Sequence, residues 1–128
     1  MLFMANVRNY RDVQPNRENP GVALHLVVGP EDGAPRFSMR VFEVEPGAST
    51  PFHTHWWEHE VFILSGQALL RGADSERQLA PNDAVFVPGD EQHCFVNTSA
   101  EALRFICCIP HAETPAPRPD LPPPRCDP

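Results

Sequence analysis

The sequence predicts an all-β domain, an antiparallel sandwich or a small barrel. Short apolar or alternating segments, about seven to nine in number, are separated by turn residues roughly every six to twelve positions. No segment repeats its apolar residues at the period of a helix. With 128 residues, 41% of them hydrophobic, the chain fits one domain. We expect a β-barrel over residues 21–110, an arm over residues 1–20 and a tail over residues 111–128.

The first two strands are predicted by runs that end at strong turn residues. Val22–Val28 is apolar except for His25 and stops at Gly29-Pro30. Phe37–Val44 alternates between apolar and polar side chains and is broken by Pro46-Gly47. We interpret His25 as a surface or loosely packed histidine rather than as a metal ligand.

The later strands are shorter and follow one another closely. One run ends at Ser65-Gly66, a hairpin signal, and another is closed by Pro88-Gly89-Asp90. Pro81-Asn82-Asp83 turns the chain between them. We therefore expect the remaining strands over Val61–Leu64, Gln67–Arg71, Gln78–Leu79, Ala84–Val87, His93–Val96 and Leu103–Ile109.

The two ends of the chain lack the pattern of a folded core. Residues 1–20 are polar and predict an irregular arm, with an edge strand near Val7–Val13. Residues 110–128 contain eight prolines and little apolar content, which predicts a flexible or polyproline-like tail. His111 and Cys126 fall in this tail, and we expect both to be solvated.

Three histidines lie close together in the central segment. His53 and His55 are two positions apart, so an extended backbone places both imidazoles on one face. His59 follows four positions later. Imidazole is the commonest protein ligand of first-row transition metals, and the cluster therefore predicts a metal site. A carboxylate, Glu58 or Glu60, could take the place of His59.

Composition and charge argue against several kinds of partner. The formal net charge is −7 and no basic cluster is present, which argues against nucleic acid and anionic membranes. No apolar run approaches the roughly 20 residues of a membrane span. The first residues do not have the pattern of a signal peptide. The four cysteines lack the spacing of a zinc ribbon or a disulfide framework, so we expect a cytoplasmic protein.

The histidine cluster is part of a pattern that resembles the first motif of the cupin superfamily. That motif places a glycine before a histidine pair and a Glu or Gln and a second glycine after it. Here a histidine stands in the place of the Glu or Gln. The residues that match are Gly47, His53, His55, His59 and Gly66.

A second segment resembles the other cupin motif. Pro88, Gly89, His93 and Asn97 fit its spacing. Asn82 and Asp90 stand where the family has glycine, and both residue types tolerate a left-handed backbone. Together the two motifs imply a cupin-type jelly-roll barrel, a double-stranded β-helix.

More narrowly, the segments Trp57–Leu64 and Phe105–Pro110 resemble the small single-domain cupins. That resemblance implies a homodimer and a manganese ion held by four histidines. Ligand type does not fix the metal, so iron, nickel, copper and zinc remain alternatives. The implied ligands are His53, His55, His59 and His93.

Spacing and alternation favour His59 over Glu60 as the third ligand. His59 obeys the motif spacing on both sides, whereas Glu60 leaves five residues instead of six before Gly66. His59 also shares a strand face with Val61 and Ile63, and Glu60 shares the opposite face with Phe62. Glu58 and Glu60 would then lie at the rim or bond to a ligand's free N–H.

Candidate pocket residues come partly from strand parity and partly from the resemblance. Strand parity places Phe95 on the face of His93 and Cys107 on the apolar face of the last strand. The resemblance points to Cys107 again and to Phe105, Arg40 and Thr50. The candidates are Arg40, Thr50, Phe95, Phe105 and Cys107, with Trp56 and Trp57 at the mouth or at a dimer contact.

Four neutral imidazoles would leave the charge of a divalent ion uncompensated, which favours anionic or enolate-like ligands. We expect a metal-dependent oxidoreductase of the dioxygenase type that acts on a small aromatic or unsaturated molecule. One alternative is a redox-neutral isomerase or decarboxylase, which needs Glu58 or Glu60 in the pocket as a base. The other is a non-catalytic module that binds a small ligand or stores metal.

Overall fold

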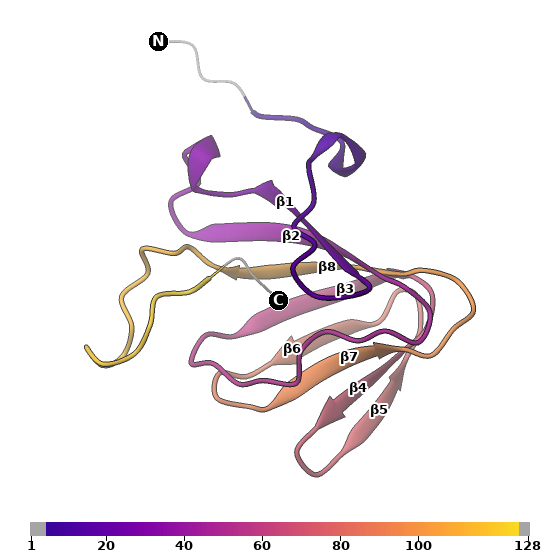
Figure 1. The fold of residues 1–128 in the computed structure, drawn as a ribbon. Helices are drawn as coiled ribbons and strands as arrows, with labels where there is room; N and C mark the ends of the chain where they lie inside the picture. The colour runs from indigo at the N-terminus through magenta and orange to yellow at the C-terminus, as the bar shows by residue number, and fades with distance from the viewer. Residues whose placement is uncertain (1–4, 126–128) are drawn as a thin grey trace.

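The computed structural model describes residues 5–125 and forms two antiparallel β-sheets. The larger sheet has the order β1-β2-β8-β3-β6 and the smaller one β5-β4-β7, and Figure 1 shows them on opposite sides of the barrel. The predicted all-β jelly-roll class is confirmed. The strands are β1 (Val22–Val28), β2 (Phe37–Val44), β3 (His59–Ser65), β4 (Ala68–Gly72), β5 (Glu76–Leu79), β6 (Ala84–Val87), β7 (His93–Asn97) and β8 (Leu103–Pro110).

Strand β8 lies at the centre of the larger sheet and organises the core. It pairs with β2 on one side and with β3 on the other. Its side chains alternate strictly between buried and half-buried, because every second one points into the barrel. Val61 and Ile63 on β3 are also buried while Phe62 between them is exposed. The predicted inward faces of both strands are therefore confirmed.

Two turns use a left-handed backbone without glycine. Asn82 has φ 78° and Asp90 has φ 68°. Asn and Asp are the residues that adopt this conformation most readily after glycine. The prediction that Asn82 and Asp90 can take the place of glycine in these turns is confirmed. The second turn leads directly to His93.

Over residues 5–20 the N-terminal arm forms one 3-10 turn, η1 (Tyr10–Asp12), and the predicted edge strand near Val7–Val13 is wrong. The Asn9 side chain accepts a hydrogen bond from the Arg11 N–H at 2.9 Å, which starts the turn. Arg104 on β8 donates to the Tyr10 hydroxyl at 2.9 Å and so holds this turn against the sheet.

His25 is buried, with 6% of its surface exposed, so its interpretation as a surface residue is wrong. It points to the outer face of β1, where the arm covers it. The Tyr10 ring meets it edge-on at 5.1 Å, and its Nδ1 lies 3.0 Å from the carbonyl oxygen of Val13. The sequence pattern of β1 alone could not show this cover.

The described part of the tail, residues 111–125, contains neither helix nor strand. His111 is 7% exposed and its Nδ1 accepts a hydrogen bond from the Glu113 N–H at 3.0 Å, so the expectation that it is solvated is wrong. The Trp56 indole N–H donates to the carbonyl of Pro122 at 2.5 Å. Cys126 lies outside the described residues, and the flexibility of the tail stays a prediction.

Within residues 5–125, no helix reaches the length and apolar character that crossing a bilayer requires.

Candidate metal centre

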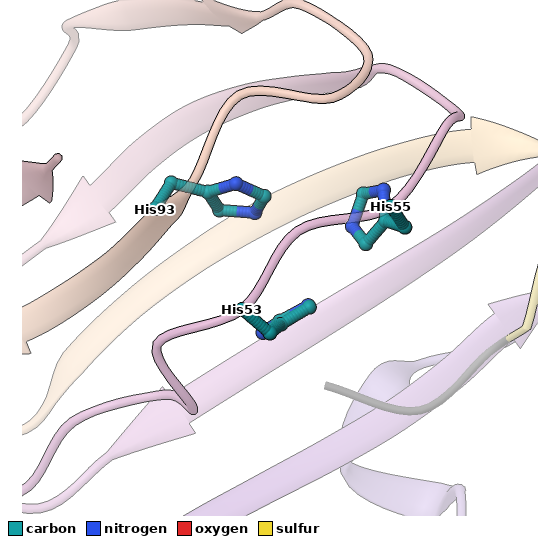
Figure 2. A group of neighbouring side chains, drawn as sticks. All are labelled: His53, His55 and His93. Atoms are coloured by element: carbon teal, nitrogen blue, oxygen red, sulfur yellow. The ribbon is translucent and has the colours of Figure 1, made fainter.

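Three histidines from two parts of the chain bring their ring nitrogens together. His53 and His55 lie in the connection between β2 and β3, and His93 is the first residue of β7. One nitrogen of each ring lies within 4.8 Å of those of the other two. Figure 2 shows the three side chains arranged around a common space. Such a group can hold one transition-metal ion.

Backbone pairing fixes the distance between the two parts of this group. The His53 N–H donates to the carbonyl of His93 at 3.2 Å, and the His93 N–H donates back at 3.0 Å. The two residues therefore form an antiparallel bridge between the loop and the smaller sheet. This bridge places their rings 5.2 Å apart, centroid to centroid.

His59 lies beside the three-histidine group. It is the first residue of β3 and 7% exposed. Its Nε2 lies 2.6 Å from Nε2 of His55, and its ring centroid lies 5.1 Å from that of His93. The structure therefore brings together all four histidines that the sequence singled out.

The competing carboxylates lie outside the barrel. Glu58 and Glu60 are both exposed. Glu60 pairs with Phe86 and Cys108 across the outer face of the sheet. Partial burial and the neighbouring Glu58 raise the pKa of Glu60. Neither carboxylate reaches the histidines from this face.

Three of the four rings are oriented by backbone carbonyls through Nδ1. The acceptors lie two residues away in each case. With Nδ1–H donated to a carbonyl, the Nε2 lone pair is free to face the centre, which is the usual arrangement of metal-bound histidine. The contacts are His53 with Pro51 at 2.7 Å, His55 with Trp57 at 2.8 Å and His93 with Glu91 at 2.8 Å.

Burial favours the neutral form of His55, His59 and His93. It lowers the pKa of His55 to about 4 and that of His59 to about 2, the second with help from the nearby Arg40 charge. Burial also lowers the pKa of His93. A neutral ring is the form that binds a metal, so the cluster is prepared for a cation at neutral pH.

The space among the rings is small and has aromatic walls. A cavity of about 20 Å³, enough for a single water molecule or ion, lies beside His53, His59 and His93. Phe105 stacks on Phe42 at 4.8 Å and meets Phe95 at 5.0 Å. The chemistry of the donors and the size of the space both fit one metal ion.

The remaining pocket candidates occupy defined places around this space. Thr50 lines the cavity, and its hydroxyl accepts a hydrogen bond from the Phe95 N–H at 2.9 Å. Arg40 is fully buried and donates to the Cys107 sulfur at 2.9 Å. Trp57 stacks on the His55 ring at 4.2 Å and so supports that ring.

Sequence reasoning missed Phe42, which lines the cavity and carries the stacked ring pair with Phe105. Strand parity could have predicted it, because Phe42 is two positions from Arg40 and shares the inward face of β2 with it.

Fold and site geometry agree with a family match over more than half of the chain. The family model described as Cupin domain matches residues 40–109, which include all four histidines of the cluster. The chain belongs to the cupin family.

The chain is similar to proteins with different names. The chain is 32% identical to 1-methylthio-D-xylulose 5-phosphate methylsulfurylase from Rhodospirillum rubrum, over 80% of this chain and 74% of that one. It is 30% identical to Protein SchB from Streptomyces halstedii, over 91% and 83%. Among solved structures it matches the polyketide cyclase RemF from Streptomyces resistomycificus, with 33% identity, a TM-score of 0.78 and coverage of 88% and 83%.

Proposed function

We propose that this cupin is a metal-dependent enzyme that acts on a small aromatic or polyketide-like carbonyl compound. The observation that carries the proposal is the group of histidines beside a small cavity that phenylalanine side chains line. An apolar interior with no lysine or arginine among the described residues of the cavity wall favours an uncharged organic substrate over a sugar phosphate. Similarity to the polyketide cyclase RemF supports the same substrate class.

The four histidines His53, His55, His59 and His93 are the proposed ligands. Manganese is the proposed metal, with iron next, although imidazole ligands bind nickel, copper and zinc more tightly and the supply of metal decides. A divalent ion held there supplies Lewis acidity toward a carbonyl or enolate oxygen.

The preferred reaction is ring closure without net oxidation. In an aldol ring closure, the acidic carbon between two carbonyl groups loses a proton to water and becomes an enolate carbon. That carbon forms a bond to a carbonyl carbon while the C=O π bond breaks, and the resulting alkoxide oxygen takes up a proton from water. Loss of water then gives an aromatic ring. The side chains of Phe42, Phe95 and Phe105 are buried and keep the interior beside the proposed ion apolar.

A dioxygenase is the second candidate, and one observation favours it. Glu58 and Glu60 are exposed on the outer face of the sheet, so neither offers a base beside the proposed ion, which weakens isomerisation and decarboxylation that need a protein base. Oxidation of an electron-rich aromatic compound places a smaller demand on such a base.

One assay separates these reactions. The protein is loaded with manganese or iron and incubated with a panel of poly-β-ketone and polyphenol compounds, with and without oxygen. Ring closure predicts anaerobic product that has lost one water, whereas a dioxygenase predicts oxygen uptake and product enriched in labelled oxygen. His53→Ala should abolish either activity. Metal binding without turnover of any compound in the panel would contradict an enzymatic role and favour a binding module.

A homodimer in the cytoplasm is also proposed. Cys94, Cys107 and Cys108 are free among the described residues, which agrees with a reducing compartment. Exposed side chains of Phe62 and Phe86 give the outer sheet face an apolar character. Light scattering at several protein concentrations tests the dimer, and a monomer mass throughout would contradict it.

A further inference from the structure

One histidine of the cluster is oriented differently from the other three. His59 lies inside the ladder of β3, where its strand pairs with β6 and β8. Its Nδ1 does not meet a nearby carbonyl. It lies 2.8 Å from the sulfur of Cys107 on β8.

Cys107 lies between Arg40, which can only donate a hydrogen bond, and His59, whose ring nitrogen donates or accepts according to its tautomer. Arg40 on β2 is its direct cross-strand partner, and the Arg40 Nη2 donates to the same sulfur at 2.9 Å. On the other side β3 brings His59 to it. Arg40, Cys107 and His59 are 0%, 1% and 7% exposed, so water does not compete for these contacts.

We propose that Cys107 is a positioning residue that holds His59 in the tautomer needed for metal binding. This inference rests on the proposed metal centre. A guanidinium is only a donor, so it cannot accept the Nδ1 proton of His59, and the sulfur is the acceptor within reach. The Arg40 Nη2 atom also lies 3.4 Å from Nδ1 of His59, but it lies closer to the sulfur, at 2.9 Å, and donates there. When the sulfur accepts Nδ1–H, the Nε2 lone pair faces the other three histidines.

The other tautomer of His59 would close the site. Its Nε2 lies 2.6 Å from Nε2 of His55, so a proton on that atom would join the two rings by a hydrogen bond. In that arrangement the Nε2 atoms of His55 and His59 could not both bind an ion. The sulfur of Cys107 therefore selects between a ring pair closed on itself and an open ligand set.

The first test measures affinity for Mn²⁺ alone, with free Mn²⁺ followed by electron paramagnetic resonance at constant pH. We expect Cys107→Ala to weaken binding by about 10- to 100-fold, the usual effect of losing a partner behind a metal ligand. Cys107→Ser keeps an acceptor and should recover most of the loss. The matched control is Cys108→Ala, because Cys108 is half-buried and pairs with Glu60 on the outer face. Equal affinity of Cys107→Ala and the unchanged protein would contradict the proposal, as would an equal loss in Cys108→Ala.

The second test observes the tautomer directly. In zinc-loaded protein labelled with nitrogen-15, we expect a proton on Nδ1 of His59 whose resonance shifts in Cys107→Ser, while that of His53 does not. A proton on Nε2 of His59 in the zinc-loaded protein would overturn the proposal. Because it uses the unchanged protein and Cys107→Ser, this measurement tests the positioning role even if Cys107→Ala fails to fold.

Two further outcomes separate the positioning role of Cys107 from the proposed reaction and from a role of the sulfur as a metal ligand. Failure to find a substrate would refute the proposed reaction but leave these affinities and resonances as expected. A sulfur-to-metal charge-transfer band in the Co²⁺-loaded protein, lost in Cys107→Ser, would show that the sulfur is itself a ligand and would overturn the positioning role.

Discussion

The Nε2 atoms of His55 and His59 lie 2.6 Å apart in the interior of the barrel. Two lone pairs repel each other at this distance unless a proton or a cation lies between them. Burial opposes protonation of either ring, as the lowered pKa values of His55 and His59 show. A neutral tautomer with the proton on one Nε2 relieves the repulsion by a hydrogen bond, and a metal ion bound by both atoms relieves it as well. The metal centre is proposed because two further imidazoles, His53 and His93, face the same space.

The metal-free protein should lose stability as the pH falls from about 6.5 toward 4. Both pKa values are lowered in the folded state, so the unfolded chain binds more protons in this range. For His59 the loss is up to about 1.4 kcal/mol per pH unit. Thermal unfolding followed at several pH values measures it. His59→Gln should flatten the dependence, whereas His111→Gln, a buried histidine outside the cluster, serves as the control. Equal slopes in the His59 variant and the unchanged protein would contradict this assignment.

Metal loading should raise the melting temperature, and removal by a chelator should reverse the change. At a free metal concentration of about 100 Kd, binding to the folded state alone adds about 2.7 kcal/mol. His53→Ala and His93→Ala should lose most of this gain because each removes a proposed ligand. Scanning fluorimetry with Mn²⁺, Fe²⁺ and Zn²⁺ measures it. A gain that persists in both variants would place the ion elsewhere.

Phe105→Ala should cost about 3–5 kcal/mol in the free energy of unfolding. The ring is 1% exposed and lies between Phe42 and Phe95, so truncation leaves a cavity beside the metal site. Urea denaturation measures the loss. Phe86→Ala is the control, because Phe86 is 61% exposed and its truncation should change stability by less than about 0.5 kcal/mol. Similar costs for the two variants would contradict the described core.

Thr50→Val should destabilise the protein by about 1–3 kcal/mol, since it leaves the buried N–H of Phe95 without its side-chain acceptor. Thr50→Ser keeps the hydroxyl and should cost much less. Urea denaturation of both variants checks the difference. A valine variant as stable as the serine variant would show that the hydroxyl does not hold Phe95 in place.

The sequence was sufficient for the barrel and for the position of His59. Alternation in β3 separates His59, Val61 and Ile63 from Glu60 and Phe62, and the structure keeps the same division. Strand parity is a local property, so a short segment contains all the information that it needs.

Contacts between distant segments could not be predicted in the same way. His25 is buried because the arm folds over β1, and nothing within the strand indicates that cover. The contact of Cys107 with His59 and Arg40 depends on the order in which β2, β8 and β3 pair. Strand order is a property of the whole fold, so parity could place Cys107 inside the barrel but could not name its partners.

The most direct test of the metal centre is anomalous diffraction from crystals of the manganese-loaded protein. We predict a single peak about 2 Å from the Nε2 atoms of His53, His55, His59 and His93, close to the distance of other metal–imidazole bonds. A peak bound by three of these rings, with His59 still paired to His55 or turned away, would contradict the four-histidine centre.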